Sequence, residues 1–230
     1  MLADNYKEVM KNIEEACKKV GRDASKVTLI SVSKTKPVSD IREVYEAGSR
    51  DFGENKVQEI LEKSPVLPND INWHMIGHLQ TNKVKQVIDK AVMIHSVDSL
   101  HLACEIEKQA ARRDIVVNIL IEVNVAKEDS KFGIFDNDEV IELVRQCSRM
   151  PHIKVCGLMT IAPYTQEPES NRNYFRSLKQ LSVDIIKENI DNISMDVLSM
   201  GMTGDYRVAI EEGATMVRVG TGIFGERNYL

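Results

Sequence analysis

The strongest constraint on the fold of this chain is a regular alternation between short apolar runs and longer stretches with helical spacing. The β-rich runs predict strands near 27–33, 50–53, 72–76, 92–95, 115–124, 153–159, 195–199 and 215–219. Helical spacing lies between them, around 38–47, 54–62, 82–90, 99–113, 136–149, 171–190 and 205–212. Because each crossover helix returns the chain to the same end of the sheet, this order predicts parallel strands.

The number of repeated units selects the architecture. Eight strand–helix units within 230 residues fit a single α/β domain, a closed (β/α)8 barrel of the TIM type over 1–230. An open doubly wound sheet is the alternative. A further helix is expected before the first strand. Its apolar face consists of Tyr6, Val9, Met10, Ile13, Cys17 and Val20.

Composition and charge exclude several classes of function. Lys and Arg number 30 against 35 Asp and Glu, a net charge of −5, which argues against a nucleic-acid-binding surface. No apolar run approaches the roughly 18 residues of a membrane span, and the N-terminal segment has no apolar signal core. We therefore expect a cytoplasmic protein that binds neither nucleic acid nor membrane. No long exposed apolar stripe calls for a partner subunit, so a monomer is expected.

The cysteines and histidines predict no metal site. The four cysteines are widely scattered and contain no Cys-x-x-Cys pair, as expected for buried thiols in a reducing compartment. They are Cys17, Cys104, Cys147 and Cys156. His74 and His78 stand four residues apart, but this spacing suits a metal only on a helix, and the run predicts a strand.

Two glycine-rich segments follow the last two predicted strands. Six of the 12 glycines lie between Gly201 and Gly225, and the hydroxyls of Ser199, Thr203 and Thr221 lie in the same region. Glycine lets backbone N–H groups converge on an anion, and the loops after strands seven and eight commonly bind phosphate in such barrels. We therefore expect a phosphate site there, with ordinary tight turns as the alternative.

Strand alternation places an arginine inside the barrel. Arg218 shares one strand face with Met216 and Gly220, while Val217 and Val219 share the other. A guanidinium does not deprotonate in proteins, so it needs an acceptor within the barrel mouth. Either a ligand supplies that acceptor or a buried ion pair does, and Glu122 is a possible partner for the pair.

Lys34 ends the first predicted strand and is a candidate nucleophile. Thr28, Ile30, Val32 and Lys34 alternate onto one face, which puts the amine at the barrel rim. Snorkelling into solvent is the ordinary role of such a lysine. Partial burial and a cationic neighbour would instead lower its pKa and free the neutral amine. A reactive lysine opposite a phosphate site points to an imine with a phosphorylated aldehyde.

Several long motifs together resemble the pyridoxal phosphate homeostasis protein family, over almost the whole chain. They are SVSKTKP (31–37), FGENKVQE (52–59), WHMIGHLQTNK (73–83), SMGMTGD (199–205) and RVGTGIFG (218–225). The family is similar in turn to the barrel domain of alanine racemase and to the fold-type III decarboxylases. The resemblance implies a cytoplasmic protein that binds pyridoxal 5′-phosphate and serves vitamin B6 homeostasis, with no settled catalytic reaction and with apo pyridoxal phosphate enzymes as candidate recipients.

The resemblance also implies individual roles. Lys34 would form the Schiff base with pyridoxal 5′-phosphate, and Arg218 would meet the pyridine nitrogen. The phosphate contacts implied are Ser199, Met200, Gly220 and Thr221. The pocket residues implied are Asn55, His78 and Met159, with Lys131 near the mouth.

Elementary chemistry supports carriage of the cofactor rather than turnover. Because arginine only donates hydrogen bonds, a pyridine nitrogen facing Arg218 stays unprotonated and is a poorer electron sink. The racemases that the chain resembles use a second domain, and the few residues after the last predicted strand leave no room for one. The alternatives are a minimal amino-acid racemase with the same cofactor and a Schiff-base aldolase without it.

Overall fold

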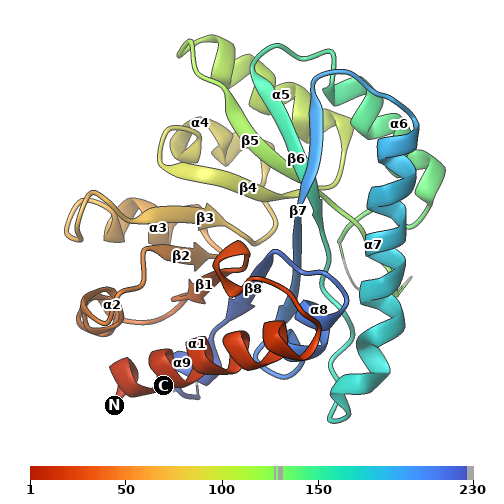
Figure 1. Ribbon diagram of the computed structural model, residues 1–230. Coiled ribbons are helices and arrows are strands. Elements are labelled where there is room, and N and C mark those ends of the chain that lie inside the picture. Colours follow the sequence, from red (N-terminus) through yellow and green to blue (C-terminus); the bar gives the residue numbers. More distant parts are fainter. Residues whose placement is uncertain (127, 129–131, 227–230) are drawn as a thin grey trace.

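The strands form a closed parallel barrel. The computed structural model describes residues 1–126, 128 and 132–226, and over these residues eight strands pair in chain order, with β8 returning to β1 (Figure 1). The strands are β1 Thr28–Val32, β2 Asp51–Glu54, β3 Asn72–Met75, β4 Ala91–Val97, β5 Val117–Glu122, β6 Ile153–Met159, β7 Ile193–Met202 and β8 Met216–Val219. The predicted barrel is confirmed, and the open-sheet alternative is wrong.

Helices surround the barrel (Figure 1). They are α1 Leu2–Lys19, α2 Val38–Glu46, α3 Val57–Lys63, α4 Val84–Val87, α5 Leu100–Ala111, α6 Asn137–Cys147, α7 Arg172–Lys187, α8 Tyr206–Glu211 and α9 Thr221–Phe224. The helix expected over 82–90 is shorter, because a 3-10 turn takes 81–83 and β4 already begins at Ala91. Among the described helices, none has the length and apolar character to cross a membrane.

The predicted N-terminal helix completes the outer ring. Only the short helix α9 follows β8 in the described chain, and α1 packs against α2, α8 and α9 beside it (Figure 1). The buried face of α1 includes Val9, Ile13 and Cys17. The Asn5 side chain donates to the Ile223 carbonyl over 2.9 Å, which joins α1 to α9. An N-terminal segment thus fills the place that the helix of an eighth unit would take.

Strand β7 is longer than predicted. It continues to Met202 instead of ending at residue 199, with a register shift against β8 between Ser199 and Met202. Gly201 permits this shift: its φ is +91°, and an added Cβ would lie 2.9 Å from the Tyr206 Cα. Ser199–Met202 therefore belongs to the barrel wall, and the glycine-containing loop begins at Thr203.

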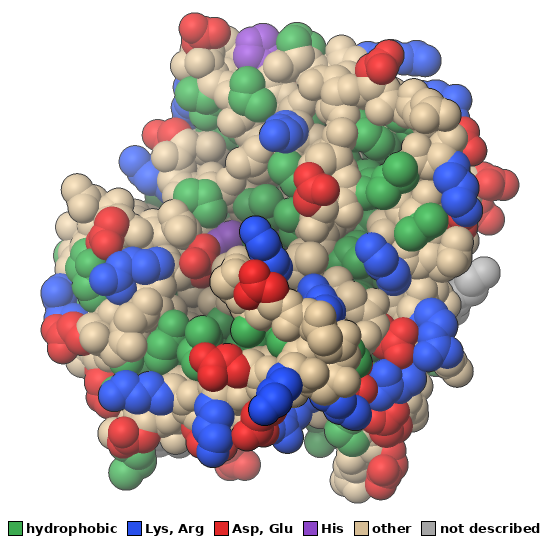
Figure 2. Space-filling model, in the orientation of Figure 1, with side chains coloured by type: hydrophobic (Ala, Val, Ile, Leu, Met, Phe, Trp, Pro, Cys, Tyr) green, Lys and Arg blue, Asp and Glu red, His purple; other side chains and the backbone are tan. Residues whose placement is uncertain are grey.

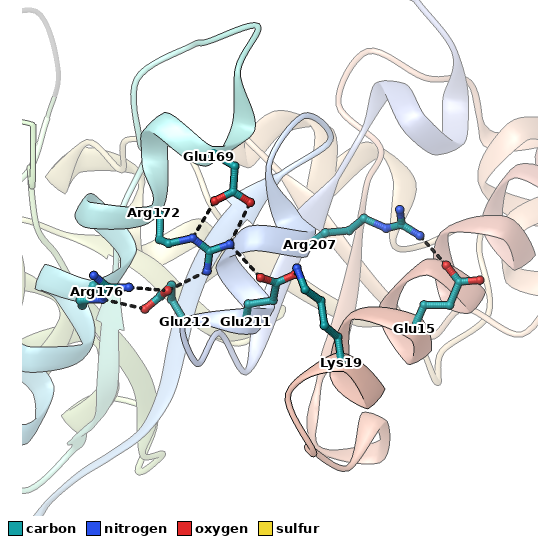
Figure 3. Close-up of polar contacts among 8 residues, drawn as sticks. All are labelled: Glu15, Lys19, Glu169, Arg172, Arg176, Arg207, Glu211 and Glu212. Carbon is teal, nitrogen blue, oxygen red and sulfur yellow. Dashed lines mark hydrogen bonds and ion pairs between the residues drawn. The ribbon is translucent and has the colours of Figure 1, made fainter.

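Charged side chains of both signs are mixed over the face of the molecule in Figure 2. On the outside of the barrel, Arg172 at the start of α7 binds Glu169, Glu211 and Glu212 over 2.7–2.8 Å (Figure 3). Lys19 of α1 also contacts Glu211, at 2.6 Å. These ion pairs connect α1, α7 and α8.

The loop after β6 is tied to the loop after β7 next to this ion-pair cluster. The Asn171 amide donates to the Pro163 carbonyl over 2.9 Å and to Asp205 Oδ2 over 2.8 Å. The other Asp205 carboxylate oxygen accepts the Met202 N–H over 2.7 Å. Side-chain contacts therefore hold both loops at the mouth of the barrel.

Close approach of β6 and β7 requires glycine at position 157. Gly157 has φ +155°, and an added Cβ would lie 1.8 Å from the Val197 carbonyl oxygen. We expect Gly157→Ala to lower the free energy of unfolding by about 3 kcal/mol or more, measured by urea denaturation. Gly204→Ala is the matched control, because an added Cβ there meets nothing within 4 Å. Equal losses in the two variants would contradict this role of Gly157.

Candidate functional site

A cavity of about 510 Å³ opens at the ends of β1 and β8 and the loops beside them. This volume lies in the range of small-molecule sites, roughly 300–1,000 Å³. Its apolar wall includes Val32, Ile76, Ile161 and Met202. Its polar wall includes Lys34, Lys36, Asn55, Thr203, Asp205, Arg218 and Thr221. The carboxyl ends of the strands, where barrel enzymes carry their active sites, thus converge on one hollow.

The backbone on both sides of Lys34 is fixed by side chains of α3. Lys34 is half-buried and follows β1. Thr35 has φ +64°, a strained conformation for a β-branched residue, and its N–H donates to Glu59 Oε2 over 2.7 Å. On the other side, the Ser33 carbonyl accepts from Lys63 Nζ over 2.9 Å. The position of Lys34 is therefore set before any ligand binds.

Lys63 is a buried cation shared by two carboxylates. Its Nζ lies 2.6 Å from Glu59 and 2.8 Å from Glu54, and the Ser33 hydroxyl also donates to Glu54, over 2.7 Å. Burial raises the Glu54 pKa to about 7, against the opposing effect of Lys63. If Lys63 were replaced by an apolar residue, both Glu54 and the Ser33 carbonyl would lose a buried donor. The cluster is thus a support for the strand ends that carry Lys34 and Asn55.

Arg218 is buried at the edge of the cavity and held by two acceptors. Its Nη1 donates to Ser199 Oγ over 2.6 Å, and its Nη2 donates to the Thr160 carbonyl over 2.7 Å. A guanidinium has five N–H donors, so these contacts leave others for a ligand in the cavity. Burial lowers the Arg218 pKa to about 10, while the Glu122 and Asp205 charges act to raise it. Arg218 is therefore a cation at neutral pH.

The structure does not show the alternative ion pair between Arg218 and Glu122. Within the described part of the chain, Arg218 contacts no carboxylate directly, and Glu122 acts on it only at longer range. Burial raises the Glu122 pKa to about 7; Asp98 raises it further and Arg218 lowers it. Arg218 is thus fixed by neutral acceptors.

Backbone donors gather on the cavity wall after β7. Among the described residues, the N–H groups of Thr203 and Gly204 meet no acceptor, and both residues line the cavity. Thr203 Oγ1 accepts the Gly222 N–H over 3.3 Å, which joins this loop to α9. Lys36 Nζ, also on the wall, donates to the Phe224 carbonyl over 2.8 Å. Unpaired N–H groups and a nearby ammonium favour an anion here.

The cavity brings together five residues of the predicted site. Lys34, Asn55, Arg218, Gly220 and Thr221 all line it.

Other predicted residues lie away from the wall. Ser199, Met159 and Met200 are fully buried; Met200 belongs to the main apolar core and Met159 to a smaller apolar cluster. His78 is stacked on Phe132, with ring centroids 4.0 Å apart, and is 3.6 Å from Asp98. The Ser199 hydroxyl is in contact with His95 Nδ1 and Arg218 Nη1. Lys131 lies outside the described residues.

Sequence reasoning missed several residues of the site. Lys36 stands in the same motif as Lys34, two residues further on, which was an available signal. Lys63 follows Glu59 by one helical turn and would have been found as an i, i+4 pair. Asp205 ends the motif 199–205 but gave no signal for its role, because its contacts with Asn171 and Met202 arise only in the folded chain.

Comparisons with known proteins agree with the motifs. The family model "Alanine racemase, N-terminal domain" matches residues 5–228. A relative from Aquifex aeolicus, named pyridoxal phosphate homeostasis protein, is 47% identical over 222 residues, which cover 96% of each chain. The solved structure of PipY from Synechococcus elongatus with pyridoxal phosphate (PLP) bound is 33% identical, with a TM-score of 0.80 over 93% of this chain and 100% of PipY.

Alanine racemase from Clostridium difficile shares the fold at 13% identity. The TM-score is 0.77, and the match covers 98% of this chain and 57% of the racemase.

The raised pKa of Glu122 predicts a pH dependence of stability. Because its pKa of about 7 in the folded protein exceeds the ordinary value of 4.5, its contribution is fully present below pH 4.5 and lost as the pH rises through 7. Glu122→Gln should remove this loss. Between pH 5 and 8 we expect the wild type to lose about 2 kcal/mol more unfolding free energy than the variant, by urea denaturation. Parallel pH profiles would contradict the assignment.

Proposed function

The chain belongs to the pyridoxal phosphate homeostasis proteins of the alanine racemase N-terminal-domain family, and from this membership we propose that it binds pyridoxal 5′-phosphate reversibly and serves cofactor supply. The observation that carries the proposal is one cavity with a positioned lysine, a fixed guanidinium and unpaired backbone donors. These three features suit the aldehyde, the ring nitrogen and the phosphate of this cofactor.

Lys34 is the residue proposed to hold the aldehyde. When bound, the cofactor supplies an aldehyde carbon that condenses reversibly with a neutral amine and releases water. The contacts at Ser33 and Thr35 fix the backbone that presents the Lys34 amine. Reversibility suits a protein that releases its cargo.

Arg218 is proposed to donate to the pyridine nitrogen. Its guanidinium is held by Ser199 and Thr160 and keeps its charge at neutral pH, so it can act only as a donor. A ring nitrogen that accepts this bond stays unprotonated and stabilises a carbanion poorly. This supports carriage of the cofactor over turnover of amino acids.

The phosphate is proposed to lie against the loops after β7 and β8. Thr203 and Gly204, whose N–H groups meet no acceptor among the described residues, line the cavity together with the exposed Thr221 and the half-buried Gly220. Lys36 adds a positive charge nearby. In this proposal Ser199 acts through Arg218 instead of touching the phosphate.

The proposal also includes the cellular compartment of the protein and the enzymes that would receive the cofactor. We infer a cytoplasmic monomer that exchanges the cofactor with apo pyridoxal phosphate enzymes. Three of the four thiols, those of Cys17, Cys147 and Cys156, are buried and free, as suits a reducing compartment. Burial raises the Cys147 pKa to about 12, so this thiol stays protonated.

Reduction should identify the lysine. We expect borohydride treatment of the protein loaded with pyridoxal phosphate to fix the cofactor on Lys34, detected by peptide mass mapping. Lys34→Ala should lose the fixed label. Lys36→Ala is the matched control and should keep it, because Lys36 serves the anion end of the cavity. A label on Lys36 or on a surface lysine in the wild type would refute the assignment.

The phosphate end can be tested with two forms of the vitamin. Thr221→Val removes one hydroxyl donor, and we expect it to weaken pyridoxal phosphate binding by about 1.5–3 kcal/mol, roughly 10- to 100-fold. Pyridoxal, which has no phosphate, is the control and should lose little affinity. The measurement is equilibrium titration of the visible absorption band. Equal losses for both compounds would place the phosphate elsewhere.

A further inference from the structure

A continuous polar chain crosses the barrel interior behind Arg218. Ser199 Oγ, which accepts from Arg218 Nη1, lies 3.0 Å from His95 Nδ1. His95 Nε2 lies 2.9 Å from His74 Nδ1, and His74 Nε2 lies 3.0 Å from Asp51 Oδ1. The five members come from β8, β7, β4, β3 and β2. They join the cavity edge to the opposite end of the barrel.

Only the last member of this chain meets solvent substantially. Ser199 and His95 are fully buried, His74 is 2% exposed and Arg218 is 5% exposed. Asp51 begins β2, and its side chain is 26% exposed. Since parallel strands all begin at the same end, Asp51 lies at the end of the barrel away from the cavity. A path of buried hydrogen bonds thus connects a partly exposed carboxylate to the guanidinium.

When both imidazoles are neutral, the Asp51 end fixes the direction of the bonds that follow it. The Asp51 carboxylate only accepts, so His74 Nε2 carries a hydrogen, and in a neutral imidazole Nδ1 is then an acceptor. His95 must then donate from Nε2 and accept at Nδ1. The Ser199 hydroxyl donates to that nitrogen, and its oxygen accepts from Arg218, which only donates. The bond from Arg218 is compatible with this orientation, because the Ser199 oxygen can accept from Arg218 while its hydrogen goes to His95.

We propose that Asp51, His74, His95 and Ser199 form a positioning relay that holds Arg218 in its donating orientation from the far end of the barrel. Burial, followed by His74 and Arg218, lowers the pKa of His95 well below its usual range, consistent with a neutral imidazole in the middle of the relay. The relay orients Nη1 toward Ser199, and the guanidinium donors that are used neither there nor at Thr160 are left for the cavity. The effect of the relay on pyridoxal phosphate binding rests on the proposed function.

A carboxylate at position 51 is essential to this relay. An amide there could donate to His74 Nε2, which would let both imidazoles reverse and donate toward Ser199. The Ser199 oxygen would then accept from His95 and Arg218 together, and its own hydrogen would need a new acceptor. Asp51→Asn thus changes the bonding beside Arg218 without altering a residue that touches Arg218.

Imidazole nitrogen NMR tests the relay directly. The chain has five histidines, so the resonances can be assigned with single His→Gln variants. In the wild-type protein without added ligand, we expect His74 and His95 both to carry hydrogen on Nε2, with Nδ1 in the unprotonated range. A hydrogen on His95 Nδ1 in the wild type would overturn the proposal, and this measurement requires no destabilising variant.

The Asp51→Asn variant tests transmission along the relay. We expect the His95 Nδ1 resonance to move toward the protonated range, although residue 51 contacts only His74 in the relay. His152→Gln is the matched control: His152 pairs with Glu107 over 2.7 Å outside the relay, and its loss should leave His95 unchanged. A folded Asp51→Asn protein with wild-type His95 resonances would reduce Asp51 to a merely structural role and overturn the relay.

Cofactor binding adds a separate readout. We expect Asp51→Asn to weaken pyridoxal phosphate binding about two- to fivefold and to shift its visible band, because a chain of polarised hydrogen bonds passes on only part of each change. The His152→Gln control should show neither effect. If the tautomers are as expected and no variant binds pyridoxal phosphate, the relay stands and the proposed function fails. If the Asp51→Asn variant binds pyridoxal phosphate with wild-type affinity and shows the wild-type visible band, the relay does not act on the site.

Discussion

The burial of one guanidinium within the barrel determines the polar interior of this protein. A buried charge is tolerated only when its donors are satisfied, and Arg218 has a hydroxyl and a carbonyl rather than a carboxylate as its acceptors. Ser199 can serve as acceptor while its hydrogen is directed to His95. Arg218 also lines the cavity, so the guanidinium donors that these two contacts leave are available to a ligand there.

The backbone around Lys34, at the end of the neighbouring strand, is also held in place before a ligand binds. Thr35 is held in a strained conformation by Glu59, and Lys63 ties Glu59 to Glu54 and to the Ser33 carbonyl. Strain of this kind persists only where the surroundings over-determine it. The loops after β6 and β7 are fixed independently, through Asn171 and Asp205. The site is thus built on a rigid frame that suits reversible capture of a small molecule.

Much of this arrangement could be predicted from the chain, because parallel strands bring their carboxyl ends to one mouth. Lys34, Arg218 and Thr221 were found from strand ends and residue alternation alone. The end of β7 was not predicted, because the strand shifts register after Ser199 and continues through Gly201 to Met202. His95 was missed because a single polar residue in an apolar strand reveals nothing of its partners. Its two direct partners, His74 and Ser199, stand on two other strands.

A crystal structure of the protein with pyridoxal 5′-phosphate most directly tests whether this cavity is the vitamin site. The account predicts continuous density from the Lys34 amine to the ring, the ring nitrogen within hydrogen-bonding distance of Arg218, and the phosphate against Thr203, Gly204 and Thr221. A ring nitrogen turned away from Arg218, or a cofactor bound outside the cavity, would contradict it.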